Sequence, residues 1–134
     1  MHIAAIHIGK NEQIKTYAKE FSKTVSNSNN FVTIIDGVME TPRMSHFRYV
    51  AFFIDSGRPF SNNCANELKK FLKEVNIQNA KHCSLFINNR IFVNKTFLAY
   101  MKILEENGFV LHFTEVIKNI NELRYILEGF YIPD

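Results

Sequence analysis

The stretch that decides the fold is YVAFFI at residues 49–54, followed directly by DSGRPF at residues 55–60. The first six residues form an uninterrupted apolar run rich in aromatic and β-branched side chains, which is typical of a strand buried on both faces of a parallel sheet. The next six contain Ser, Gly and Pro, which mark a loop. Residues 49–60 therefore predict a central strand followed by a polar loop.

Four further runs have the character of strands, and helical patterns lie between most of them. The expected strands are residues 2–8, 31–35, 83–87 and 109–113, the last of which can extend to Val116. Apolar residues at helical spacing predict helices that carry Ile14–Val25, Ala65–Val75, Phe97–Leu104 and Ile120–Phe130. Residues 37–47 are too broken for a long helix.

The ends of these helices carry recognisable signals. Asn11 is expected to cap the first helix, and Asn119 with Glu122 three residues later resembles a capping box. Gly108 follows the third helix, where a left-handed residue is often needed. Strands that alternate with helices imply right-handed crossovers onto one parallel sheet with helices on both faces. We expect one α/β domain over residues 1–134, with a five-stranded sheet of order 2-1-3-4-5.

Composition excludes several classes of protein. The net charge is +3, and the densest lysine cluster, Lys69, Lys70 and Lys73, is balanced by Glu67 and Glu74, so it is read as a solvated helix face and no nucleic-acid partner is expected. The N-terminus has no signal-peptide pattern, and no apolar run approaches the ~20 residues that span a bilayer. The expected location is the cytoplasm, without a membrane partner.

From Phe47 onward the chain resembles the flavodoxin and NAD(P)H:quinone-reductase group. Residues 46–56 resemble the third strand of that group, and residues 56–63 lie where the group often has a serine- and proline-containing loop. Residues 68–72 resemble its next helix, and residues 81–87 and 104–111 continue the pattern. The resemblance implies a three-layer flavodoxin-like fold and FMN as a cofactor.

The resemblance also assigns candidate cofactor-binding residues to three loops. They are Gly9, Lys10 and Asn11 in the first loop, Ser56, Gly57, Arg58 and Phe60 in the second, and Asn88, Asn89 and Arg90 in the third. Phe60 and Phe92 are the aromatic residues placed to flank a flavin ring, and the alternative is that both simply pack.

The first loop departs from the pattern of the group. Flavodoxins hold the FMN phosphate in a loop rich in Ser, Thr and Gly, but residues 9–13 here read GKNEQ, with no hydroxyl residue before Thr16. Glu12 also brings a negative charge toward the place of a phosphate. The third loop, residues 88–90, lacks the glycine and aromatic residue usual there. We therefore expect that FMN is not tightly bound.

Other kinds of site find little support in the sequence. Cys64 and Cys83 form no CxxC motif, and neither they nor the histidines, which are read as structural, have metal-ligand spacing. Ser56 lacks the G-x-S-x-G elbow of a nucleophile, and no phosphate-binding P-loop is present. Asp55 ends a central strand like the phospho-acceptor of response-regulator receivers, but the acidic pair expected after the first strand is missing.

Three functional hypotheses remain. In the first, the chain is a flavodoxin-like protein that has lost tight FMN binding and acts through protein contacts or a small anionic ligand. In the second, it is an FMN-dependent electron carrier or quinone reductase with atypical loops. In the third, it is a small enzyme of other chemistry at the strand ends. Under each hypothesis the catalytic residues are unknown and a homodimer is left open. The first is preferred. Lys10, Arg58 and Arg90 are expected to form an anion-attracting crevice at the strand ends, and the alternative is that Asp55 and Glu12 neutralise these cations locally and the loops face solvent.

Overall fold

The computed structural model describes residues 1–133. Its strands are β1 His2–Ile8, β2 Phe31–Asp36, β3 Tyr49–Ile54, β4 Lys81–Asn88 and β5 Phe109–Ile117. Its α-helices are α1 Glu12–Val25, α2 Asn63–Val75, α3 Val93–Glu106 and α4 Ile120–Glu128, and a 3-10 turn, η1, spans Met44–His46. Within residues 1–133, no helix is both long enough and apolar enough to cross a membrane.

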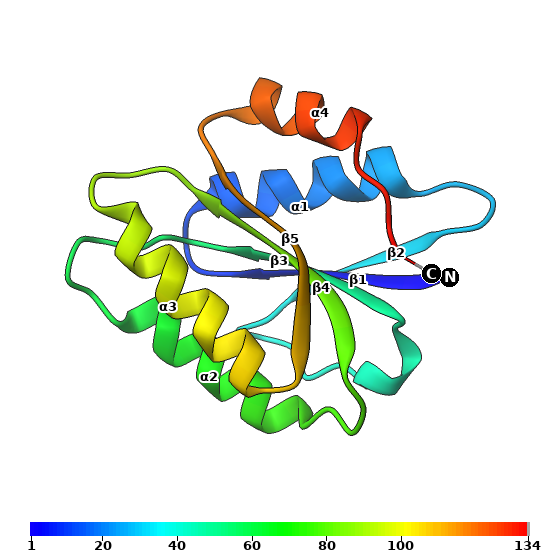
Figure 1. The fold of residues 1–134 in the computed structure, drawn as a ribbon, viewed down its shortest axis with the longest axis horizontal. Helices are drawn as coiled ribbons and strands as arrows, with labels where there is room; N and C mark the ends of the chain where they lie inside the picture. The colour runs from blue at the N-terminus through cyan, green and yellow to red at the C-terminus, as the bar shows by residue number, and fades with distance from the viewer. Residues whose placement is uncertain (134) are drawn as a thin grey trace.

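All strand pairs are parallel, and the sheet order is β2-β1-β3-β4-β5. This confirms the predicted α/β architecture. Helices α1 and α4 cover one face of the sheet, and α2 and α3 cover the other (Figure 1). The strand order reverses between β1 and β3, so the loops that follow these two strands begin next to each other, as Asp55 N–H donating to the Ile8 carbonyl shows.

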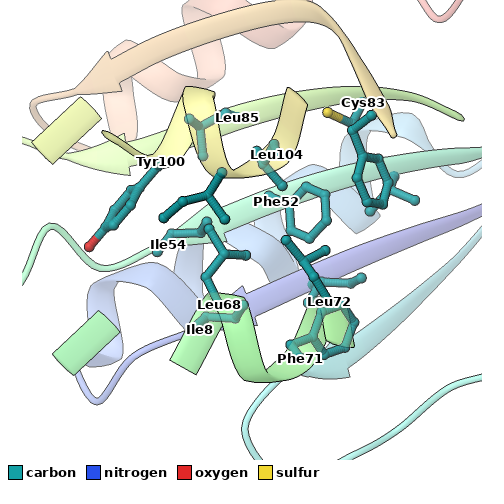
Figure 2. Packing of buried hydrophobic residues seen from close by; sticks show 14 of the residues in the cluster. Ile8, Phe52, Ile54, Leu68, Phe71, Leu72, Cys83, Leu85, Tyr100 and Leu104 are labelled. Carbon is teal, nitrogen blue, oxygen red and sulfur yellow. The ribbon is translucent and has the colours of Figure 1, made fainter. Parts of the chain in front are cut away.

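Each face of the sheet has its own hydrophobic core. On the α2–α3 face, Phe52 packs edge-on against Phe71 and Phe109. Figure 2 shows this core, with Tyr100 at its margin and the tyrosine hydroxyl pointing out of it. On the α1–α4 face, Phe53 and Phe86 stack with ring centroids 4.9 Å apart. Because β3 is buried at every position, the apolar run YVAFFI fills both cores at once.

The structure corrects the sequence prediction at the end of the chain. The last helix ends at Glu128 and not at Phe130, because Gly129 lies outside the helix and its N–H donates to the Ile126 carbonyl. Phe130 nevertheless packs on the α1–α4 core, against Phe21 and Phe113. Its apolar signal therefore marks burial and not helix. The short η1 confirms that the chain between β2 and β3 forms no long helix.

Candidate functional site

Three loops meet at the carboxyl ends of the strands, and one buried side chain joins two of them. Asn88, the last residue of β4, is 5% exposed. Its Oδ1 accepts hydrogen bonds from Ser56 N–H at 2.7 Å and from the Ser56 hydroxyl at 2.9 Å. Its Nδ2 donates to Asp55 Oδ1 at 3.4 Å. Asn88 therefore fixes the path of the β3–α2 loop from the neighbouring strand.

Arg90 provides a second connection between the same two loops. Its Nε donates to the Ser56 carbonyl at 2.9 Å, one terminal nitrogen donates to the Ile91 carbonyl at 2.7 Å, and the other donates to Thr96 Oγ1 at 2.6 Å. All three acceptors are neutral. Tyr100 on α3 adds a further link, since its hydroxyl donates to the Asp55 carbonyl at 2.8 Å. The two loops are thus held in one arrangement.

The side chain of Asp55 packs against Gly9, the first residue of the β1–α1 loop. Gly9 has a φ of +124°, and a Cβ built at this glycine would lie 2.3 Å from Asp55 Cβ and 3.2 Å from Asp55 Oδ2. Asp55 Oδ1 accepts a hydrogen bond from Gly57 N–H at 2.9 Å, which orients the carboxylate. A carboxylate therefore lies against the start of the β1–α1 loop, at the point where the strand order reverses.

The first turn of α1 is already supplied with hydrogen-bond acceptors. Asn11 caps the helix as predicted, because its side chain accepts from Gln13 N–H at 2.9 Å and its carbonyl accepts from Ile14 N–H at 3.1 Å. The Thr16 hydroxyl donates to the Glu12 carbonyl at 3.0 Å. These bonds use donors that a phosphate-binding helix start would offer to its ligand.

The two aromatic residues singled out in the sequence lie together and face solvent. Phe60 is 97% exposed and Phe92 is 72% exposed, with ring centroids 6.5 Å apart and planes inclined by 39°. Both have left-handed backbones, with φ of +64° and +62°. A non-glycine residue with such a φ is strained, by roughly 1 kcal/mol or more. Their exposure shows that neither ring occupies a core position, although the two rings pack against each other.

The comparisons with known proteins agree on the fold. Neither models of protein families nor the sequences of curated proteins give a match. Among solved structures, the Megasphaera elsdenii flavodoxin in its two-electron reduced form gives a TM-score of 0.75 at 11% identity, covering 94% of this chain and 96% of that one. The chain has a flavodoxin-like fold.

Two further solved structures support this assignment. The Streptococcus pneumoniae TIGR4 flavodoxin has a TM-score of 0.73 at 7% identity, covering 96% of this chain and 94% of that one. Oxidised flavodoxin 1 from Bacillus cereus has a TM-score of 0.70 at 12% identity, covering 96% of this chain and 93% of that one. At such low identity the similarity concerns the flavodoxin-like fold alone.

A pocket of about 320 Å³ lies beside the aromatic pair of this flavodoxin-like fold, between the starts of α2 and α3. Of the predicted site residues, Phe60, Phe92 and Arg90 line it, whereas Lys10 and Arg58 do not. Lys10, Arg58 and Asn89 are exposed. Arg90 instead lines this pocket together with Lys95, and the crevice of Lys10, Arg58 and Arg90 stays a prediction.

Sequence reasoning missed Lys95, Thr96 and Tyr100, which contribute to this pocket from α3. Thr96 and Tyr100 lie four residues apart and so share one face of the helix. That spacing is the signal that could have shown them, because it combines a hydroxyl with an aromatic residue on the side facing the β3–α2 loop. The apolar periodicity alone counted only Phe97, Leu98, Met101 and Leu104.

Burial controls the ionisable groups near the strand ends. It raises the pKa of the Cys64 thiol to about 11, with the Asp55 carboxylate adding to this effect. Burial also lowers the pKa of His7, with Asp36 acting in the opposite direction. A thiol with a raised pKa is protonated near neutral pH, so Cys64 is a poor nucleophile.

Among residues 1–133, no three side chains of His, Cys, Asp or Glu are placed to share a metal ion.

Replacing Phe60 by asparagine should stabilise the protein. Asn tolerates the left-handed conformation, and removing the exposed Phe60 ring gives up almost no buried apolar surface. We expect Phe60→Asn to raise the free energy of unfolding by about 0.5–1 kcal/mol, which corresponds to about 3 °C in Tm. The matched control is Ile91→Asn, which is also exposed but is not among the residues with positive φ. Thermal unfolding measures both, and equal or lower stability for Phe60→Asn than for Ile91→Asn would contradict strain at Phe60.

Proposed function

We propose that this flavodoxin-like protein does not hold FMN tightly and binds a small anionic ligand at the carboxyl ends of its strands. The observation that carries this proposal is the position of Asp55 against Gly9. Flavodoxins bind the FMN phosphate at the loop after the first strand, according to the resemblance described above. A carboxylate at that loop repels a phosphate, since like charges at close range disfavour each other.

The loop itself gives further support. Asn11 satisfies two N–H groups of the first turn of α1, and Glu12 is acidic in that turn. No hydroxyl group precedes Thr16, whose side chain donates to the backbone of its own helix. The residues present therefore do not fit the phosphate of FMN, and no step of an electron-transfer reaction is derived through this cofactor.

A second candidate function is electron transfer or quinone reduction with a flavin. It is favoured by Phe60 and Phe92, which present exposed rings from the two loops that the resemblance assigns to the flavin ring. In this alternative the aromatic pair alone would hold the flavin, without help from the first loop. Contact with another protein through the same exposed rings belongs with the first candidate, because it also requires no tightly bound FMN.

Titration with flavins separates these functions. The protein is expected to purify without colour, and FMN should not saturate it below about 100 µM, a binding free energy of about −5.5 kcal/mol. Riboflavin, which lacks the phosphate, should bind within about tenfold of FMN, because the first loop adds no favourable contact to the phosphate. Quenching of flavin fluorescence measures both affinities. Sub-micromolar FMN affinity, lost with riboflavin, would overturn the proposal in favour of the second candidate.

The control for this titration is Asp55→Asn, which keeps the shape of the side chain and removes its charge. If the carboxylate repels the phosphate, FMN should bind this variant more tightly than the wild type while riboflavin is unaffected. Equal FMN affinities for Asp55→Asn and the wild type would show that the charge of Asp55 does not exclude the cofactor.

A further inference from the structure

The pocket between α2 and α3 has an unusual balance of charge. Among residues 1–133, its lining contains two cationic side chains, Arg90 and Lys95, and no Asp or Glu. The other residues of the lining are neutral: Pro59, Phe60, Ser61, Asn62, Ala65, Phe92, Thr96, Ala99 and Tyr100. Asp55 and Glu12 lie outside this set. The charged side chains that line this pocket are therefore all positive.

Arg90 is held in place without a counter-ion. Its three hydrogen bonds go to two carbonyl groups and one hydroxyl group, none of which carries a charge. The ion pairs within residues 1–133 join Lys102 with Glu106 and Arg124 with Glu20, so neither Arg90 nor Lys95 has a carboxylate partner there. A guanidinium has five N–H groups, and three bonds leave two of them to donate elsewhere. Arg90 is thus a fixed cation with unused donors.

The aromatic pair borders the same space. Phe60 and Phe92 line the pocket of about 320 Å³, and with Lys95 and Asn94 they also line a second hollow of about 430 Å³. The two rings therefore line both hollows, and their exposed faces can contact a planar ligand. Their strained backbones are of the kind found at ligand-binding positions, where function opposes local stability.

We propose that this pocket binds a planar aromatic acid. The ring of the ligand lies against Phe60 and Phe92, and its carboxylate or phosphate group receives hydrogen bonds from Arg90 and the charge of Lys95. This proposal rests on the proposed function and specifies where the anion binds: between α2 and α3, away from the β1–α1 loop. The flavodoxin resemblance implies the other position for the anionic group, at the β1–α1 loop.

The size of the pocket limits the ligand. About 320 Å³ is at the lower end of the volumes found for small-molecule sites, roughly 300–1,000 Å³. One or two fused rings with a single acidic group match this space, whereas FMN, with three fused rings and a sugar phosphate chain, exceeds it. Arginine suits either acid, because its planar fork matches carboxylate and phosphate oxygens.

Three naphthalene probes test the proposal: 1-naphthoate, 1-naphthyl phosphate and the uncharged 1-naphthamide. We expect at least one of the acids to bind tenfold or more tightly than the amide, and the naphthoate-to-phosphate ratio identifies the preferred acid. Naphthalene fluorescence measures the affinities. Phe60→Asn should weaken binding of the acids and of the amide alike, because it removes the ring contact and leaves the cations.

Lys95→Gln and Lys10→Gln form a matched pair, since both lysines are exposed and lie near the start of a helix on opposite sides of the sheet. Lys95→Gln should weaken acid binding about fivefold and leave the amide unchanged, whereas Lys10→Gln should change neither. Arg90→Lys should also weaken the acids, and circular dichroism checks that its loops remain folded.

Equal affinity for acid and amide, no detectable binding of any probe, or no effect of Lys95→Gln would overturn this inference. If Lys10→Gln weakens acid binding and Lys95→Gln does not, the anion binds beside α1; the proposed function then survives and the pocket assignment fails. Sub-micromolar FMN affinity would instead overturn the proposed function, whatever the naphthalene probes show.

Discussion

Gly9→Ala should lower the free energy of unfolding by about 3–5 kcal/mol. Two costs combine at this position. A Cβ would lie 2.3 Å from Asp55 Cβ, so Asp55 must move and give up its hydrogen bond to Gly57 N–H. In addition, a φ of +124° is strained for any residue with a side chain. Urea denaturation measures the loss, which belongs to the upper range for single substitutions.

Two other glycines separate these costs. Gly57 has a φ of +73°, but the nearest atom to its built Cβ is Cys64 Sγ at 3.8 Å, so Gly57→Ala should cost only the backbone strain of about 1–2 kcal/mol. Gly129 has an ordinary φ, and no atom of residues 1–133 beyond its own chain neighbours lies within 4 Å of a Cβ built there, so Gly129→Ala should change stability by less than about 0.5 kcal/mol. Equal effects at Gly9 and Gly57 would show that Asp55 does not crowd the first loop.

Asn88→Ala should destabilise the protein by about 2–4 kcal/mol. The substitution removes the acceptor for both the N–H and the hydroxyl of Ser56, which is 2% exposed and so cannot turn to water without movement of the loop. A buried donor without a partner costs about 1–3 kcal/mol, and the lost side-chain volume adds to this. Hydrogen exchange of the Ser56 amide should also become faster.

Asn89→Ala is the matched control for this variant. Asn89 is exposed, and its N–H donates to the Ile117 carbonyl through a backbone hydrogen bond that alanine preserves. Its effect on stability should be under about 0.5 kcal/mol. A loss as small for Asn88→Ala would mean that Asn88 does not hold the β3–α2 loop.

The fold could be predicted because its determinants are local. The run YVAFFI has no charged residue, as expected of a strand between two apolar layers, and β1 and β4 contain the shorter apolar runs IAAI and LFI. Helix ends were predictable where a short side chain caps its own helix, as Asn11 and Asn119 do. The end of α4 was misjudged because periodicity reports burial, and Phe130 is packed on the core although the helix has already ended.

The site was less predictable because its interactions join residues far apart in the sequence. Phe60, Phe92 and Arg90 were found from their places in loops, and the structure brings all three to one pocket. Nothing in the sequence shows that Asp55 covers Gly9 or that Arg90 is fixed by neutral acceptors, because both depend on how adjacent loops turn. The grouping of Lys10 and Arg58 with Arg90 stays a prediction, since only Arg90 of the three lines this pocket.

The hydrogen bonds that join Ser56 to Asn88 and Arg90 also limit how this fold can be re-engineered. A flavin-binding loop transplanted after β3 would arrive without the backbone geometry that Asn88 and Arg90 require, and these two side chains would lose acceptors or donors that their own loop cannot replace. The loop after β4 must therefore be exchanged together with the loop after β3. For the same reason, a library that varies one of these loops alone should yield fewer folded members than a library that varies both as a pair.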